Sequence, residues 1–406
     1  MSYPDIDLNL TEEQKALRDM VKTFGAEVMR PAGIELDKLG DPADVIADGS
    51  VLWDVFKQYR ELGLHATGFS KSIGGSSEDM DPMMGILMLE ELAYADAGLA
   101  ISLGCAGMPF SICQLLPVPA LQDLARQFVE DKDCELVGCW GITEPDHGGD
   151  WGLGGDKPEC GPSLRGVLKG DEYILNGQKA AWVSNGTIAT HSVLHVGLDP
   201  SRGMQGQGIA ICPLDLEGIT KGKPLDKIGQ RPLNQGEIFF DDVRLPKEYM
   251  FMTPQPPDAE GGGLFSGGGT PMGSMAVMFG GLARAALDEA IKYSKERIQG
   301  GVPIFEHKNI KLKLFEMFMM TESARSLSRR LQLYNSSGTA SMVHTMAGKW
   351  MSTETAFKVA SEAIQIFGGN GLSKEYVIEK LFRDARAAMI EDGTNEALAL
   401  SVVDNL

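Results

Sequence analysis

At the stretch Leu136-Val137-Gly138-Cys139-Trp140-Gly141-Ile142, the chain changes from helix-forming to strand-forming sequence. Short apolar runs follow up to about residue 252, and clusters of Gly, Asp, Asn and Pro separate them, as in a series of strands. No helical pattern alternates with these runs, so a parallel Rossmann sheet is not expected. We expect an antiparallel barrel or sandwich. The predicted strands are 136–142, 173–175, 192–196, 208–214 and 237–243.

The sequence before this stretch is helical. Thr11 and Gln14 form a capping box, and an apolar stripe follows until Pro31, which we expect to end the helix. Asp81-Pro82 is an N-cap followed by a first-turn proline, so a second helix is expected to begin there. The uncharged stretch Ala97–Gln122 is long enough to span a bilayer, but its prolines and glycines favour two buried helices joined by a turn.

The sequence after the strands is helical again. A loop rich in proline and glycine, 254–269, is expected to separate the two regions. From 343 to 367 apolar residues recur at helical spacing, and Gly368-Gly369-Asn370-Gly371 is expected to end this helix. We therefore expect an α+β protein of three domains. They are an all-α domain (1–135), an antiparallel β-barrel (136–252), and a four-helix bundle that starts with the Gly/Pro-rich loop (253–406).

Charge and composition exclude several functional classes. Lys and Arg total 37 and Asp and Glu total 56, so the 406 residues carry a formal net charge of −19. This excess disfavours nucleic acid and anionic membrane surfaces as partners. Six cysteines without metal-binding or redox spacing, and a start without a leader pattern, favour a cytoplasmic protein with reduced thiols.

Common cofactor and hydrolase motifs are absent from the sequence. It contains no GxGxxG, GxxxxGK[ST], HExxH or GxSxG, and its six histidines occur singly, so we expect neither a Rossmann NAD site nor a metal. Two loops remain as candidate ligand sites. Thr143 precedes a turn with two glycines, and Asn176-Gly177 is expected to form a hairpin turn before Trp182 and Ser184, whose indole and hydroxyl suit a flat ring. A barrel turn and a core tryptophan are the alternative interpretations.

Several motifs occur together and in order along the chain. They are Thr143-Glu144-Pro145 with Gly148 and Asp150, Asn176-Gly177-Gln178-Lys179 with Trp182 and Ser184, Phe239-Phe240-Asp241-Asp242-Val243-Arg244-Leu245-Pro246, Gln365-Ile366-Phe367-Gly368-Gly369, Arg383-Asp384-Ala385-Arg386 and Gly393-Thr394-Asn395-Glu396. Each motif alone is weak. Together they resemble the acyl-CoA dehydrogenases of the FAD-dependent flavoprotein superfamily over nearly the whole chain.

The resemblance implies a reaction. In such enzymes FAD lies between the strand domain and the C-terminal bundle, and a carboxylate removes the proton α to a CoA thioester. The β-hydride passes to flavin N5, which leaves an enoyl-type thioester. The resemblance also implies an acyl-CoA substrate, an electron-transferring flavoprotein as acceptor, and a homotetramer or dimer.

The resemblance divides the expected FAD contacts into two groups. The first group would surround the flavin: Trp140, Thr143, Gly148, Gly149, Trp182, Ser184, Thr394 and Glu396. The second would serve a neighbouring subunit, with Arg297 on the pyrophosphate and Gln365, Gly368 and Gly369 at the adenosine end. A surface charge near a helix C-terminus is the alternative interpretation of Arg297.

The position of the family's glutamate base holds Asp392, one methylene shorter, which we expect to be the base. The adjacent Glu391 is the fallback. Asp96 would abstract a proton from a more distant carbon, or else it is a helix-end carboxylate. The family's other base position corresponds to about Thr270, which has no carboxylate nearby.

The shifted base and the glycine-rich loop suggest an atypical acyl group, such as a cyclohexane- or cyclohexene-carboxyl thioester. Met272 stands where an arginine often supports the enolate region or CoA, so FAD binding is the firmer expectation. Two other classes remain open. Nitroalkane oxidases share the scaffold and use an aspartate base, and a non-catalytic flavoprotein would retain FAD without turnover.

Overall fold

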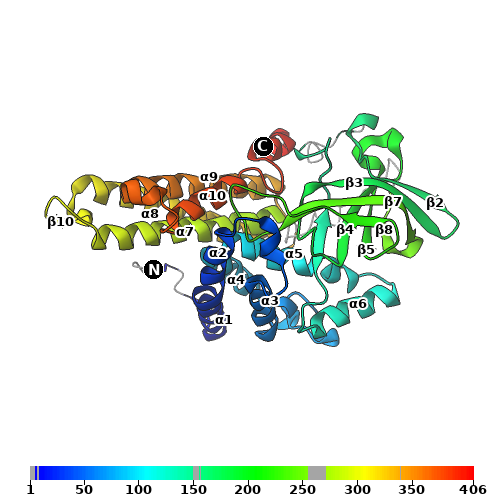
Figure 1. Cartoon of the computed structure of the whole chain (residues 1–406), viewed down its shortest axis with the longest axis horizontal. Coiled ribbons are helices and arrows are strands. Elements are labelled where there is room, and N and C mark those ends of the chain that lie inside the picture. Colours follow the sequence, from blue (N-terminus) through cyan, green and yellow to red (C-terminus); the bar gives the residue numbers. More distant parts are fainter. Residues whose placement is uncertain (1–4, 7–8, 150–154, 156, 255–270, 339) are drawn as a thin grey trace.

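The computed structural model describes the chain except residues 1–4, 7–8, 150–154, 156, 255–270 and 339. Figure 1 shows a long helical arm at one end, a sheet at the other, and the N-terminal helices packed beneath their meeting point. The expected order of helices, strands and helices is confirmed. The domain limits themselves remain predictions, and the Gly/Pro-rich loop, Asp150 and Thr270 lie outside the described residues.

Six α-helices form the N-terminal part within the described residues. They are α1 (Glu12–Phe24), α2 (Arg30–Asp37), α3 (Val51–Glu61), α4 (Pro82–Ala95), α5 (Ala97–Cys113) and α6 (Pro119–Glu130). The capping box at Thr11 and the N-cap at Asp81 are confirmed. The expected helix end at Pro31 is wrong. A π-helical turn, Gly25–Met29, joins α1 to α2, so the helical backbone continues through Pro31, which lies in the first turn of α2.

The uncharged stretch after α4 forms two helices, as predicted. α5 and α6 are joined by a short turn, and Asp96 caps α5 by accepting a hydrogen bond from Leu99 N–H (2.9 Å). Pro109 lies inside α5 rather than ending it. None of the helices in the described ranges combines the length and apolar composition that a membrane span requires.

The middle part is one sheet with strand order β6-β7-β3-β2-β4-β5-β8, and β1 pairs with β4. Its strands are β1 (Gly138–Gly141), β2 (Arg165–Lys169), β3 (Glu172–Ser184), β4 (His191–Gly197), β5 (Gln207–Pro213), β6 (Ile219–Lys221), β7 (Gln235–Pro246) and β8 (Met250–Met252). Most pairs are antiparallel, but β1 and one residue of β2 pair with β4 in parallel, so the sheet is mixed.

Both faces of the central strands are covered. On β4, Val193 packs in a cluster that includes Phe110 of α5 and Phe128 of α6, whereas Leu194 and Val196 pack in the cluster of the opposite face. Successive side chains of a strand point to opposite faces, so a strand covered on both sides reads as a continuous apolar run.

The expected hairpin turn at Asn176-Gly177 is wrong. These residues form a β-bulge inside β3, because the pairing with β7 shifts between Leu175 and Gly177. The Asn176 side chain donates to Asp242 Oδ1 and accepts from Asp242 N–H, both at 2.9 Å. Gly177 has φ of 136°, and a Cβ there would lie 2.8 Å from Leu164 Cα. Glycine is needed at position 177 because the bulge requires a positive φ and the backbone of Leu164 passes too close for a side chain.

The C-terminal part is a bundle of long helices. It comprises α7 (Pro271–Glu296), α8 (Lys308–Asn335), α9 (Met342–Phe367), α10 (Ile378–Ala388) and α11 (Asn395–Val402), with the small hairpin β9 (Ile298–Gln299) and β10 (Val302–Pro303) after α7. α9 ends at Gly368, with φ of 61°, as expected from the sequence.

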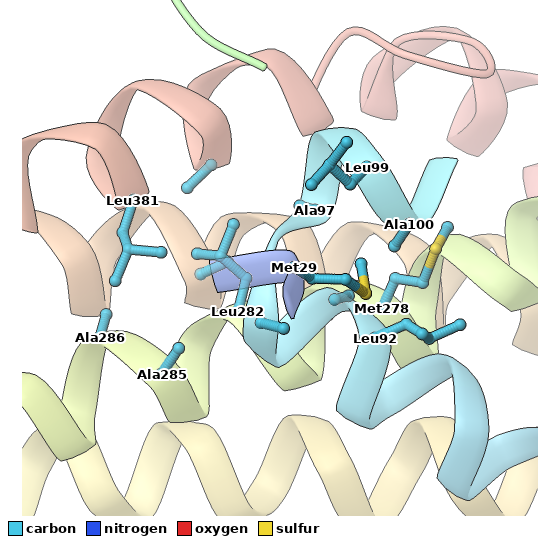
Figure 2. Packing of buried hydrophobic residues seen from close by; sticks show 14 of the residues in the cluster. Met29, Leu92, Ala97, Leu99, Ala100, Met278, Leu282, Ala285, Ala286 and Leu381 are labelled. Carbon is cyan, nitrogen blue, oxygen red and sulfur yellow. The ribbon is translucent and has the colours of Figure 1, made fainter. Parts of the chain in front are cut away.

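One apolar core joins the two helical parts. Figure 2 shows side chains from both parts interdigitating: Met29, Leu92, Ala97, Leu99, Ala100, Met278, Leu282, Ala285, Ala286 and Leu381. Small residues on α7 let α4 and α5 approach closely, and long side chains fill the gaps between them. This core fixes the position of α10, and therefore of the loop that follows it.

Candidate active site

The loop between α10 and α11 meets the sheet and α5. Burial, followed by the charge of Asp392, raises the pKa of the Cys105 thiol on α5, and Ser184 at the end of β3 hydrogen-bonds this thiol. A Cβ on Gly149 would lie 3.9 Å from the backbone N of Thr394. We call this meeting point, defined by these five residues, the domain junction.

Asp392 has an unusual backbone and no partner within the described residues. Its φ is 52°, in the left-handed region, and Gly393 follows with φ of 95°. The residue is partly buried, yet neither its carboxylate nor its backbone N–H makes a hydrogen bond to another described residue. Burial raises the pKa of Asp392, and the charge of Lys349 opposes that effect. Partly buried polar groups are usually hydrogen-bonded within a protein. Because the carboxylate and the backbone N–H of Asp392 are not, both groups are available to a ligand.

Glu391 lies in a different environment from its neighbour. Its Oε2 accepts a hydrogen bond from Gln230 Nε2 at 3.0 Å, so the loop before β7 holds it. Burial raises the pKa of Glu391 to about 7 against the hydrogen bond from Gln230, and the charge of Asp392 adds to the rise. Its carboxylate is thus engaged in the protein.

Asp96 is also engaged. In addition to capping α5, its Oδ2 lies 2.6 Å from Lys380 Nζ, and Lys380 also pairs with Asp384 at 2.5 Å. Asp96 is buried, with 3% of its surface exposed. These contacts tie α5 to α10. A role of Asp96 in proton abstraction remains a prediction.

The sheet side of the domain junction carries groups that fit a planar ring. Trp182 is 58% exposed, which is high for an indole. Gln235 donates to Trp182 O (3.1 Å) and to Ser184 Oγ (3.2 Å), which fixes the strand end. A Cβ on Gly148 would meet no atom within 4 Å. An exposed aromatic face, a hydroxyl and open glycine backbone suit the stacking and hydrogen bonds of a flavin.

Three further residues of the first group lie at this end of the sheet and bundle. Thr143 is partly buried, and its carbonyl accepts from Ala180 N–H at 2.9 Å. Thr394 Oγ1 accepts from Ala397 N–H at 3.2 Å and so caps α11, on which Glu396 is exposed. Their contacts with a cofactor remain predictions.

Trp140 lies deeper than Trp182. It is 9% exposed, and its indole N–H donates to His195 Nε2 at 3.0 Å. His195 Nδ1 lies 2.8 Å from Gln207 Oε1, so the imidazole carries its proton on Nδ1. Burial lowers the pKa of His195 to about 4, so the ring is neutral.

The second group of expected FAD contacts lies elsewhere on the bundle. Tyr293 stacks on Phe367 with ring centroids 3.9 Å apart, so the end of α7 with Arg297 meets the end of α9 with Gly368. Arg297, Gln365, Gly368 and Gly369 are all exposed. Lys349 of α9 contacts Gly393 at the domain junction. Gly368 follows Lys349 by nineteen residues, so at a helical rise of 1.5 Å per residue the two lie about 29 Å apart.

A separate cavity of about 440 Å³ opens between α4, α7 and α8. Its lining is uncharged and includes Leu89, Ser274 and Asn335. None of the site residues expected from the sequence lines this cavity.

Comparison with known proteins identifies the family. Models of the N-terminal, middle and C-terminal domains of acyl-CoA dehydrogenases match residues 11–115, 139–243 and 273–406. A probable acyl-CoA dehydrogenase of Bacillus subtilis is 30% identical over 99% of this chain and 100% of its own length. The chain belongs to the acyl-CoA dehydrogenase family. It is therefore an oxidoreductase that acts on CH–CH bonds, in a family that depends on FAD.

Other known proteins are similar to this acyl-CoA dehydrogenase over nearly the same length. Cyclohex-1-ene-1-carbonyl-CoA dehydrogenase of Geobacter metallireducens is 28% identical over 96% of both chains. The structure of butyryl-CoA dehydrogenase from Megasphaera elsdenii is 28% identical with a TM-score of 0.83, covering 98% of this chain and 99% of the other. A chain in the structure described as the electron transferring flavoprotein of Acidaminococcus fermentans is 27% identical with a TM-score of 0.81, over 98% and 99%.

Several residues at or beside the domain junction were not predicted from the sequence. Lys349 lowers the pKa of both Glu391 and Asp392, Gln230 hydrogen-bonds Glu391, and the charge of Asp392 acts on the Cys105 thiol. Lys349 alone had a visible signal, because it is a charged residue on the inward side of the apolar helix 343–367. Cys105 and Gln230 stand in segments with no pattern that points to a site.

Proposed function

We propose that this acyl-CoA dehydrogenase uses Asp392 as the base that removes the α-proton of an acyl-CoA thioester. The observation that carries the proposal is the carboxylate of Asp392, partly buried and without a hydrogen-bond partner among the described residues. Glu391 and Asp96, in contrast, are held by Gln230 and Lys380. A general base works best when its pKa is near the working pH, and burial raises the pKa of Asp392.

The protein's part in the reaction follows from these groups. The Asp392 carboxylate takes the α-proton, and the electron pair of that C–H bond becomes part of the new double bond as the β-hydride leaves. The backbone N–H of Asp392, which makes no bond to a described residue, would donate to the thioester oxygen as negative charge develops there. Bound FAD supplies the acceptor for the hydride.

The residues proposed to hold FAD fall into two places. Trp182, Ser184, Thr143 and Thr394 would hold the flavin at the domain junction. Arg297 and Gly368 lie at the other end of α9, so we propose that they serve the FAD of a second copy of this chain. A dimer or tetramer is thus part of the proposal.

For the acyl group we propose an alicyclic ring, such as a cyclohexane- or cyclohexene-carboxyl thioester. The shorter base, Asp in place of Glu, supports an acyl group that differs from the usual straight chain. The similarity to a cyclohex-1-ene-1-carbonyl-CoA dehydrogenase is in line with this proposal. An electron-transferring flavoprotein is the proposed acceptor, in line with the similarity to a chain in a structure described as an electron transferring flavoprotein.

The test is an anaerobic titration of the FAD-loaded protein with a panel of cyclic and straight-chain acyl-CoA thioesters. We expect cyclic thioesters to bleach the oxidised flavin band fastest. A clear preference for butyryl- or octanoyl-CoA would contradict the alicyclic proposal while leaving the base intact.

A variant pair tests the base. Asp392→Asn should retain FAD and lose about 10²–10⁴-fold in the rate of flavin bleaching, because the proton acceptor is gone. Asp392→Glu keeps a carboxylate and should retain much of the rate. Full activity of Asp392→Asn would exclude Asp392 as base. Consumption of nitroethane with rapid reoxidation in air would instead indicate a nitroalkane oxidase, and an absence of bleaching by any substrate would indicate a non-catalytic flavoprotein.

A further inference from the structure

Lys349 is a buried cation behind the proposed base. It lies in the N-terminal half of α9 and is fully buried, with 0% of its surface exposed. Its Nζ donates to the carbonyl of Gly393 and to Oδ1 of Asn395, both at 2.9 Å. Asn395 is fixed in turn, because its Nδ2 donates to Thr353 Oγ1 at 3.1 Å. Both partners of Lys349 thus belong to the segment that directly follows Asp392.

Neither partner of Lys349 carries a charge. Buried lysines are rare and usually form an ion pair, because a buried charge without a counter-charge is costly. Within the described residues, Lys349 forms no ion pair at hydrogen-bonding distance. Its charge is therefore not neutralised by direct contact, and it acts on the acidic groups around it.

The charged and titratable groups of this region come from several elements. Asp392 faces Lys349 of α9 and Cys105 of α5, and Glu391 precedes it on the same loop. Lys227, in the segment before β7, faces Glu391. Glu396 of α11 also acts on Lys349. Of these groups, only Lys349 opposes the effect of burial on Asp392.

We infer that Lys349 is a positioning residue for Asp392: it holds the carbonyl of Gly393 in place and supplies the positive charge that keeps the Asp392 carboxylate ionised. The inference rests on the proposed role of Asp392 as base. The left-handed conformation of Asp392 costs free energy because the residue is not glycine, and the bond from Lys349 to Gly393 anchors the backbone directly after it.

The electrostatics agree with this geometry. Burial raises the pKa of Asp392, and Lys349 lowers it. Burial lowers the pKa of Lys349 to about 8, against the raising effects of Asp392, Glu391 and Glu396. Below about pH 8 Lys349 is charged, so it favours the ionised base in the range where Asp392 would otherwise bind a proton. Without this charge, the base should protonate at a higher pH.

The experiment compares the pH dependence of flavin reduction by an acyl-CoA in wild type, Lys349→Met and Lys349→Arg. We expect the midpoint of the acidic limb to move up by about one pH unit or more in Lys349→Met, since one pKa unit corresponds to 1.36 kcal/mol of charge interaction. Lys349→Arg keeps the charge and should stay close to wild type. Lys358→Met is the matched control, because Lys358 lies on the same helix with 56% of its side chain exposed.

A second variant covers the case in which Lys349→Met does not fold. Asn395→Asp has nearly the same volume and places a carboxylate 2.9 Å from Nζ of Lys349, where it would pair with that charge. The acidic limb should again move to higher pH. An unchanged midpoint in a folded, FAD-loaded variant would overturn the inference. Persistent bleaching and an unaltered acidic limb in Asp392→Asn would instead show that the proposed base is wrong.

Discussion

Neighbouring carboxylates at the domain junction differ in what surrounds them. Glu391 is hydrogen-bonded by Gln230 across a domain boundary, whereas Asp392 has no such partner among the residues that the structure describes. Lys349 faces both residues. The pair therefore combines a carboxylate that holds the loop with one that is available to a substrate, and the difference is made by residues distant in the sequence.

The environment of Glu391 predicts a pH-dependent cost to stability. Burial, with the charge of Asp392, raises the pKa of Glu391 from 4.5 to about 7. Below pH 4.5 the group is protonated in the folded and unfolded states, and above pH 7 it is ionised in both. Between these values the unfolded chain releases its proton first, so Glu391 removes stability from the folded state as the pH rises.

Glu391→Gln should therefore gain stability relative to wild type as the pH increases from 4.5 to 7. The check is urea unfolding of both proteins at several pH values, because effects of other groups cancel in the difference. A difference in the free energy of unfolding that stays constant across this range would contradict the prediction.

The proposal of Asp392 as base could be made from the sequence, whereas a contact of Lys349 with this loop could not be predicted. Asp392 precedes Gly393-Thr394 in a motif that is continuous along the chain. The bond from Lys349 to Gly393 joins residues 44 positions apart, and it exists only because α9 and the loop after α10 pack together. A lysine on the apolar side of a helix indicates an inward charge, but not what that charge faces.

At the level of helices and strands, short sequence patterns showed where the backbone departs from regular structure, but not which irregular structure it adopts. Asn176-Gly177 is typical of a hairpin turn, but the strand continues through it because β7 pairs on both sides of a bulge. Pro31 is typical of a helix end, but a π-helical turn before it lets the helical path continue. In both cases the tertiary partner decided between two structures that the residues allow.

Close packing of α4 on α7 depends on a glycine without space for a side chain. A Cβ on Gly281 would lie 2.3 Å from the backbone oxygen of Glu90 and 3.1 Å from Tyr94 N, so the helices would have to separate. That movement would also disturb the bond from Arg284 to Glu90 (2.8 Å). Gly281→Ala should therefore lose about 3 kcal/mol of stability, the upper part of the usual range for overpacking.

The matched control is Gly85→Ala in the same helix pair. A Cβ on Gly85 would meet no atom within 4 Å, so the substitution should gain about 0.5–1 kcal/mol from the better helix propensity of alanine. Both changes can be measured by denaturant unfolding. Equal effects of the two substitutions would show that helix contact at Gly281 is not the reason for its cost.

For the whole molecule, one polar junction ties the three parts together. Arg383 of α10 donates to both carboxylate oxygens of Asp37 in α2, at 2.9 and 2.6 Å, and also to Ile228 O in the segment before β7 (2.8 Å). Arg231 of that segment donates to Asp37 O (3.1 Å) and Leu39 O (2.7 Å). The order of helices and strands could be predicted from the sequence, but this junction could not, because its members lie far apart in the chain.

Arg383→Met should destabilise the protein by about 3–5 kcal/mol, since it leaves Asp37, 2% exposed, as a buried carboxylate without its fork of donors. Arg383→Lys should rescue little, because an ammonium group cannot donate in two parallel bonds to one carboxylate. Arg386→Met, an exposed position on the same helix, should change stability by less than about 0.5 kcal/mol.

Urea unfolding followed by tryptophan fluorescence and by far-UV circular dichroism would measure these losses. Because Arg383 contacts all three parts, its replacement should also make the unfolding transition seen by fluorescence differ from the one seen by circular dichroism. A small loss of stability with coincident transitions would mean that the apolar core alone holds the parts together.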